Sequence, residues 1–119
     1  MPDLHALESL GIDTAAGIAY CAGDEEFYQE MLEVFVSDAG EKGQALARYV
    51  QAKNWERYRI TVHALKSAAR MIGANALADL AQTQEQAAKA GEEAALCAGH
   101  RALTDTVEEL CAALGRLLP

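Results

Sequence analysis

Residues 55–72 read WERYRITVHALKSAARMI, and the spacing of their apolar side chains decides the fold. At about 100° per residue, one arc of this segment collects the side chains of Trp55, Tyr58, Val62, Leu65, Ala69 and Ile72. Such an arc is typical of an amphipathic helix that packs one face against a protein core. His63 lies roughly 130° from the middle of the arc, so we expect its imidazole to face solvent.

Three cations share this exposed helix surface with His63. Arg59 precedes the histidine by four residues, and Lys66 and Arg70 follow it by three and seven, which are neighbouring positions on a helix. The chain has only ten Lys and Arg residues and a net charge of −8, so the cluster is a local exception. Nearby cations favour the neutral, nucleophilic form of an imidazole and stabilise an anion attached to it. The pattern favours phosphoryl transfer through His63; the alternative is a solvated face with an incidental histidine.

A second patch of apolar or small side chains lies beside the histidine, made of Ile60, Ala64, Ser67 and Met71. One interpretation is that these residues pack on a neighbouring helix. The other is that they form a docking surface, because small side chains let a partner approach the ring within bonding distance. The candidate partner-binding residues are therefore Arg59, Ile60, Ala64, Ser67, Arg70 and Met71.

The remaining sequence predicts further helices on both sides of this segment. A long helix should run to residue 52 after its N-cap Asp24, with a core stripe of Phe27, Met31, Phe35, Ala39, Leu46 and Val50. Gly40 and Gly43 lie inside that helix and mark a bend or a close helix contact. Two short helices precede it, over residues 2–10 and 14–21, the second with Asp13 as N-cap.

After the central helix, which Asn54 caps, we expect helices over residues 75–90 and 92–117. The last one carries an apolar stripe that includes His100, which should therefore be a buried or half-buried core side chain. Short connections imply antiparallel neighbours. The chain thus predicts an all-α fold, an antiparallel up-and-down four-helix bundle with short additional N-terminal helices, as a single domain over residues 1–119.

The composition narrows the function. A net charge of −8 argues against nucleic acid and anionic membrane surfaces, and no apolar run is long enough to span a bilayer. The three cysteines suit a reducing compartment, and the N-terminus does not resemble a signal peptide, so we expect a cytoplasmic protein. The sequence has neither metal-ligand spacing nor a glycine-rich phosphate loop. We therefore expect no cofactor, no metal and no kinase or ATPase activity of its own.

The segment HALKSAARMIGANALADLAQTQEQAAKAG, residues 63–91, resembles the signature of histidine-containing phosphotransfer (HPt) domains. The positions that match this signature are His63, Leu65, Lys66, Gly73, Leu77 and Glu85. Ser67 stands where the family usually has glycine. The upstream run GIDTAAGIAYCAGDEEFYQEMLEVF is similar to the N-terminal helices of the family, so the resemblance covers about residues 11–115.

The resemblance implies a phosphorelay intermediate that accepts a phosphoryl group on one histidine and exchanges it with a receiver-domain aspartate. His63 would be the nucleophile through Nε2, and Lys66 would screen the phosphoryl oxygens. Glu85 would either accept a hydrogen bond from Nδ1–H or remain a solvated surface carboxylate. The implied partners are a response-regulator receiver domain and a histidine kinase or hybrid histidine kinase, and we expect a monomer.

Two other classes of function stay open. One is a helical interaction module that binds response regulators without being phosphorylated, and the other is a structural acidic bundle. The intact pair of His63 and Lys66 argues against the first, and the basic surroundings of the histidine argue against the second. The initiating Met1 favours a free-standing protein over a domain of a larger kinase.

Overall fold

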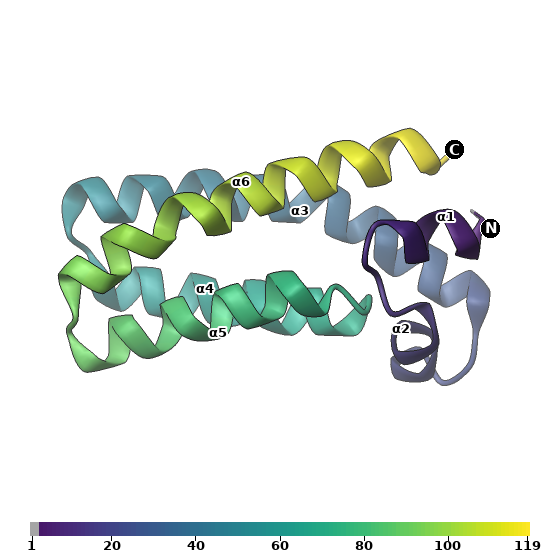
Figure 1. The fold of residues 1–119 in the computed structure, drawn as a ribbon, viewed down its shortest axis with the longest axis horizontal. Helices are drawn as coiled ribbons and strands as arrows, with labels where there is room; N and C mark the ends of the chain where they lie inside the picture. The colour runs from purple at the N-terminus through teal and green to yellow at the C-terminus, as the bar shows by residue number, and fades with distance from the viewer. Residues whose placement is uncertain (1–2) are drawn as a thin grey trace.

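Six α-helices make up residues 3–119, the part of the chain that the computed structural model describes (Figure 1). In chain order they are α1 (Leu4–Ser9), α2 (Thr14–Tyr20), α3 (Glu25–Ala52), α4 (Trp55–Met71), α5 (Asn75–Ala90) and α6 (Glu93–Leu117). Residues 3–119 contain no strand, so the predicted all-α class is confirmed. Pro2, where the first short helix was predicted to begin, lies outside the described residues.

The four long helices form a closed ring of contacts. Helix α3 packs on α4, α4 on α5, α5 on α6, and α6 returns to pack on α3. Each short connection reverses the direction of the chain, and α1 and α2 lie beside one end of the bundle (Figure 1). This arrangement places α4 and α5 side by side along their length.

Side-chain caps start the helices at three predicted positions. Asp13, Asp24 and Asn54 each accept a hydrogen bond from the backbone N–H three residues further on, at 3.0, 3.1 and 3.2 Å respectively. These bonds satisfy amide groups that have no partner inside the helix. The starts of α2, α3 and α4 are therefore determined by local sequence.

The apolar arc predicted for α4 faces the core. Tyr58, Val62, Leu65 and Ala69 are fully buried, and Trp55 at the start of the helix is half-buried. Helix α3 continues through Gly40 and Gly43 without a break, as predicted. A Cβ at position 43 would lie 3.8 Å from Val107, an ordinary packing distance, so this glycine lies where α3 passes α6.

The predicted core stripe of α3 is wrong at its first position. Phe27 is 42% exposed, whereas Tyr28 and Leu32 are fully buried. The physical reason is a buried hydrogen bond of 2.8 Å from the Tyr28 hydroxyl to the carbonyl oxygen of Ile72, at the end of α4. This bond turns the first turn of α3 so that its neighbour Phe27 points outward.

Close backbone approach attaches the two N-terminal helices to the end of α4. The Asp13 N–H donates to the carbonyl oxygen of Gly73 at 2.9 Å. Gly73 has a φ of +82°, and a Cβ there would collide with the Asp13 carbonyl oxygen. Gly17 is equally confined, since a Cβ on it would collide with the Tyr28 ring and lie 2.8 Å from the Ile72 oxygen. Only glycine fits these two positions without a shift of the backbone.

Gly17→Ala should therefore destabilise the protein, although alanine is the better helix former. We expect the free energy of unfolding to fall by about 2 kcal/mol, since the added methyl group overpacks a closed site. The matched control is Gly40→Ala on α3, where nothing lies within 4 Å of an added Cβ. That change should raise the stability by up to about 1 kcal/mol. Urea unfolding of both variants tests the expectation, and a stabilised Gly17→Ala protein would contradict it.

Candidate functional site

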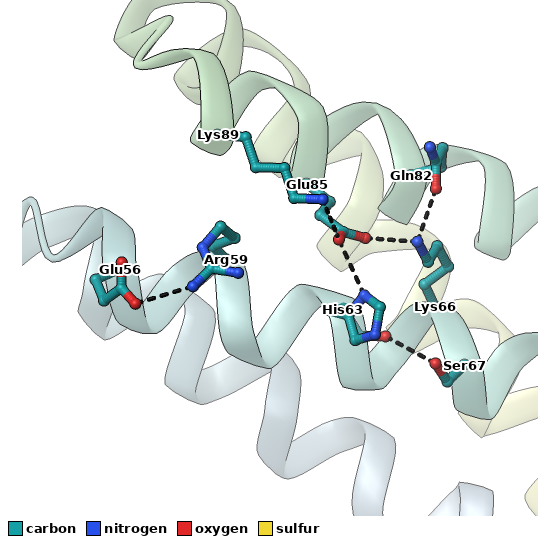
Figure 2. A network of polar contacts seen from close by, with 8 residues as sticks. All are labelled: Glu56, Arg59, His63, Lys66, Ser67, Gln82, Glu85 and Lys89. Atoms are coloured by element: carbon teal, nitrogen blue, oxygen red, sulfur yellow. Dashed lines mark hydrogen bonds and ion pairs between the residues drawn. The ribbon is translucent and has the colours of Figure 1, made fainter.

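His63 lies in the middle of α4, on the side of the helix opposite the buried arc. Its side chain is 57% exposed, as the sequence predicted from its angular position. Helix α5 runs next to this face and contributes Glu85, whose side chain reaches across to the imidazole (Figure 2). The site is therefore an open helix surface and not a pocket.

The ring of His63 is oriented by a single carboxylate. Its Nδ1 lies 2.9 Å from Oε2 of Glu85. An ionised carboxylate can only accept hydrogen bonds, so the shared proton belongs to Nδ1. In a neutral ring the lone pair is then on Nε2, at the opposite edge of the imidazole. The contact thus selects the tautomer in which Nε2 carries the free lone pair.

Glu85 is buried, so the alternative of a solvated surface glutamate is wrong. Only 3% of the residue is exposed. Burial acts to raise the pKa of its carboxyl, but hydrogen bonds from Lys66, His63 and Lys89 outweigh burial and lower the pKa to about 2. Its Oε1 lies 2.6 Å from the Lys66 ammonium, and its Oε2 receives His63 and, at 3.3 Å, Lys89. A carboxylate with these partners is ionised at neutral pH.

The expectation that Lys66 belongs to an exposed row of cations is wrong. Its side chain is only 12% exposed. Its Nζ lies 2.8 Å from Oε1 of Gln82 and 2.6 Å from Oε1 of Glu85, both on α5 (Figure 2). The reason is that α5 covers this side of α4, so the ammonium is desolvated and must find partners there. Of its three N–H donors, these contacts use two.

The two arginines of the predicted row behave differently. Arg59 is partly exposed and pairs with Glu56 one turn earlier on the same helix, at 2.9 Å. Arg70 is exposed near the end of α4. Surface cations of this kind act mainly as a diffuse, salt-sensitive field. The three cations therefore divide into one structural partner of Glu85 and two surface charges.

Sequence reasoning missed Gln82 and Lys89. Both lie on α5, three residues before and four residues after Glu85, so they share its helix face. The signal was available in that spacing: a lysine one turn after a glutamate on a helix pairs with it. What the spacing could not reveal is that Lys66 of α4 would meet the same carboxylate.

The predicted docking patch is mostly open to solvent. Ile60 is 50% exposed, and Ala64 and Ser67 are also exposed. The hydroxyl of Ser67 donates to the carbonyl oxygen of His63 at 3.2 Å, within its own helix (Figure 2). Met71 is half-buried beside α3, where Val34 adds an apolar side chain that is 46% exposed. Met71 therefore packs partly on a neighbouring helix, whereas half of Ile60 stays open to solvent.

The fold and this site define a class: an all-helical bundle with a carboxylate-oriented histidine on its surface. Comparison with known families identifies that class. The family model described as Hpt domain matches residues 30–113, more than two thirds of the chain. The chain therefore belongs to the Hpt domain family. A comparison with curated proteins finds no match, and neither does a comparison with solved structures.

Hpt domains are helical bundles that take part in phosphotransfer in two-component signalling, where they interact with receiver domains and histidine kinases. Among residues 3–119, no helix is both long enough and apolar enough to cross a membrane.

The depressed pKa of Glu85 predicts a specific loss of stability in acid. Between its ordinary value of 4.5 and about 2, the unfolded chain binds a proton at Glu85 that the folded chain does not. The contribution of Glu85 is therefore fully present above pH 4.5 and is lost as the pH falls toward 2. Glu85→Gln lacks this contribution. The stability gap between wild type and variant, measured by urea unfolding from pH 6 to about pH 3, should narrow on acidification. If the stabilities of wild type and variant stayed the same distance apart over this pH range, the low pKa of Glu85 would be contradicted.

Proposed function

We propose that this protein is a phosphorelay intermediate that accepts a phosphoryl group on Nε2 of His63 and passes it to or from an aspartate of a receiver domain. The observation that carries the proposal is the contact of 2.9 Å between Nδ1 of His63 and the buried carboxylate of Glu85. It leaves the reactive nitrogen on the exposed side of an Hpt domain.

The transfer step follows from this geometry. The lone pair of Nε2 attacks the phosphorus of an aspartyl phosphate, an N–P bond forms, and the bond between phosphorus and the aspartate oxygen breaks. The aspartate leaves as a carboxylate, while the proton on Nδ1 stays where it is. The ring thereby gains positive charge, which the negative carboxylate of Glu85 stabilises at 2.9 Å. In the reverse direction the phosphoryl group leaves Nε2 for a receiver aspartate, and the ring loses this stabilising interaction with the carboxylate of Glu85. The same site can therefore serve transfer in both directions.

The surrounding cations have separate roles in this proposal. Lys66 holds Glu85 ionised and in place, and its remaining N–H donor is available to a phosphoryl oxygen. Arg59 and Arg70 are surface charges that act on the approaching partner. Lys89, whose side chain is 58% exposed, pairs with the same Glu85 oxygen that receives Nδ1 and so helps to keep the carboxylate ionised.

The apolar patch beside the ring is the proposed docking surface. Ile60, Ala64, Ser67 and Met71 form it together with Val34 of α3. Small side chains at positions 64 and 67 let a receiver domain approach Nε2. We propose a response-regulator receiver domain and a histidine kinase as partners, a monomeric protein, and a cytoplasmic location. A cytoplasmic location suits the three free cysteines of the chain.

His63→Gln should abolish labelling by a phosphorylated receiver domain, because no other group of the site can act as the nucleophile. The variant should stay folded and lose only about 1 kcal/mol of stability, because the side chain is largely exposed but gives up its hydrogen bond to the buried Glu85. His5→Gln is the matched control on an exposed histidine of α1 and should label like wild type. The measurement is transfer of acid-labile, alkali-stable label. Label that persists in the His63 variant would refute the assignment.

Ile60→Asp should separate docking from chemistry. The side chain is half-exposed, so the stability should change by about 0.5 kcal/mol or less. Binding to a receiver domain, measured by calorimetry, should weaken at least about tenfold through the loss of one apolar anchor. Labelling by the small donor phosphoramidate should continue at the rate of wild type.

The control for Ile60→Asp is Ala112→Asp, which adds the same charge at an exposed position of α6, a helix that packs on α3 and α5. It should leave receiver binding unchanged. Equal weakening by both changes would show that net charge and not the patch governs docking.

A further inference from the structure

A chain of buried polar groups crosses the core one residue away from Glu85. Gln84 of α5 is 2% exposed, and its Nε2 donates to the hydroxyl oxygen of Tyr58 on α4 at 3.0 Å. The same nitrogen donates to the carbonyl oxygen of Leu96 on α6 at 2.7 Å. The Tyr58 hydroxyl in turn lies 3.1 Å from Nδ1 of His100 on α6. A single amide therefore joins three helices of the bundle.

The direction of these hydrogen bonds is determined by the acceptors. A carbonyl oxygen can only accept, so the nitrogen of the Gln84 amide must face Leu96. Both of its N–H groups are then used, and one of them goes to the hydroxyl oxygen of Tyr58. That hydroxyl can donate its own proton to Nδ1 of His100 when the imidazole is neutral with its proton on Nε2. Burial lowers the pKa of His100, in agreement with a neutral ring.

A glycine makes room for this amide. Gly99 of α6 faces Gln84, and a Cβ at position 99 would collide with Oε1 of Gln84 and lie 3.0 Å from its Cδ. Its φ is not in the left-handed region, so backbone conformation does not require glycine there. Space for the amide is what requires it.

We propose that Gln84 is the positioning residue of the pair formed by His63 and Glu85. Neighbouring residues on a helix point about 100° apart, so anchoring Gln84 to α4 and α6 also fixes the direction of Glu85. A carboxylate roughly 6 Å from the helix axis moves about 2 Å when the helix rotates by about 20°. A shift of that size is enough to break a hydrogen bond of 2.9 Å.

The hydrogen bonds of Gln84 hold α5 more rigidly than the contacts of Lys66 do. Lys66 also connects α4 to α5, but its long flexible side chain can follow the carboxylate of Glu85 if α5 rotates. Gln84 is enclosed by three helices and has no such freedom. An apolar side chain would fill this place without the desolvation cost of an amide. A buried amide whose two N–H groups are both bonded instead selects one rotation of the helix among several packings.

The test is Gln84→Met, which keeps the side-chain length and removes the hydrogen bonds. The readout is the tautomer of His63, from nitrogen-15 NMR of its ring. Wild type should show the proton on Nδ1. The variant should shift toward the form with the proton on Nε2, and labelling by phosphoramidate should fall roughly fivefold because the reactive tautomer becomes the minor one. The consequence for labelling rests on the proposed function, but the tautomer shift does not.

Leu114→Ala is the control for a purely structural effect. This leucine is fully buried near the C-terminal end of α6, so its truncation lowers stability by leaving a cavity. It should keep the wild-type tautomer of His63 and the wild-type rate of labelling.

Gly99→Ala gives an independent second variant. Alone, it should displace the Gln84 amide and shift the His63 tautomer as Gln84→Met does. Added to Gln84→Ala, where the collision has gone, it should cause no further shift. This non-additivity is the signature of a shared mechanism.

The proposal is overturned if Gln84→Met and Gly99→Ala lower stability, as Leu114→Ala does, but leave the His63 ring with the wild-type tautomer. If the tautomer shifts as expected while even wild type is not labelled by phosphoramidate or a phosphorylated receiver domain, Gln84 is still the positioning residue and the proposed function is wrong. The two failures are therefore distinguishable.

Discussion

The buried carboxylate of Glu85 is the constraint on which the site depends. A charge in the protein interior needs close partners, and this one takes Lys66 on one oxygen and His63 and Lys89 on the other. Two of these partners come from α4, so the carboxylate holds α4 and α5 together while it orients the imidazole. The same carboxylate thus joins the two helices and orients the ring of His63. Its low pKa reflects the hydrogen bonds that serve both purposes.

Two sets of polar contacts join α4 and α5, one near the surface and one inside the bundle. Nearer the surface, the exposed His63 meets the buried carboxylate of Glu85, which also pairs with the largely buried Lys66. Deeper in the bundle, Gln84 joins Tyr58 and the α6 backbone. The apolar arc of α4 supplies most of the burial, but apolar contacts are not directional. Hydrogen bonds are directional, so we propose that they determine which rotation of the helices the apolar core adopts. The imidazole of His63 is therefore exposed but well oriented.

In the proposed function, an open site of this kind depends on its partner for the rest of the chemistry. The face around His63 offers an oriented nucleophile, nearby cations and an apolar patch that includes Ile60, but no enclosing pocket. Such a surface suits a partner that brings the phosphoryl group with it and covers the ring on binding. The short connection between Met71 and Asn75 keeps α4 and α5 in contact beside this face.

Sequence by itself determined the local features of this protein. The N-caps at Asp13, Asp24 and Asn54, the buried arc of α4 and the exposure of His63 all follow from spacing along one helix. Such features depend on residues within a turn or two of each other, so periodicity and capping rules are sufficient to predict them.

Only the tertiary structure decided which groups of different helices meet. It turned Tyr28 inward in place of Phe27, buried Lys66 under α5 and brought Lys89 to the carboxylate. It also placed the amide of Gln84 against Gly99, a contact that no spacing within either helix suggests. The physical reason is that periodicity shows which face of a helix is apolar. How that helix is rotated against its neighbours is determined by the packing of all of them together.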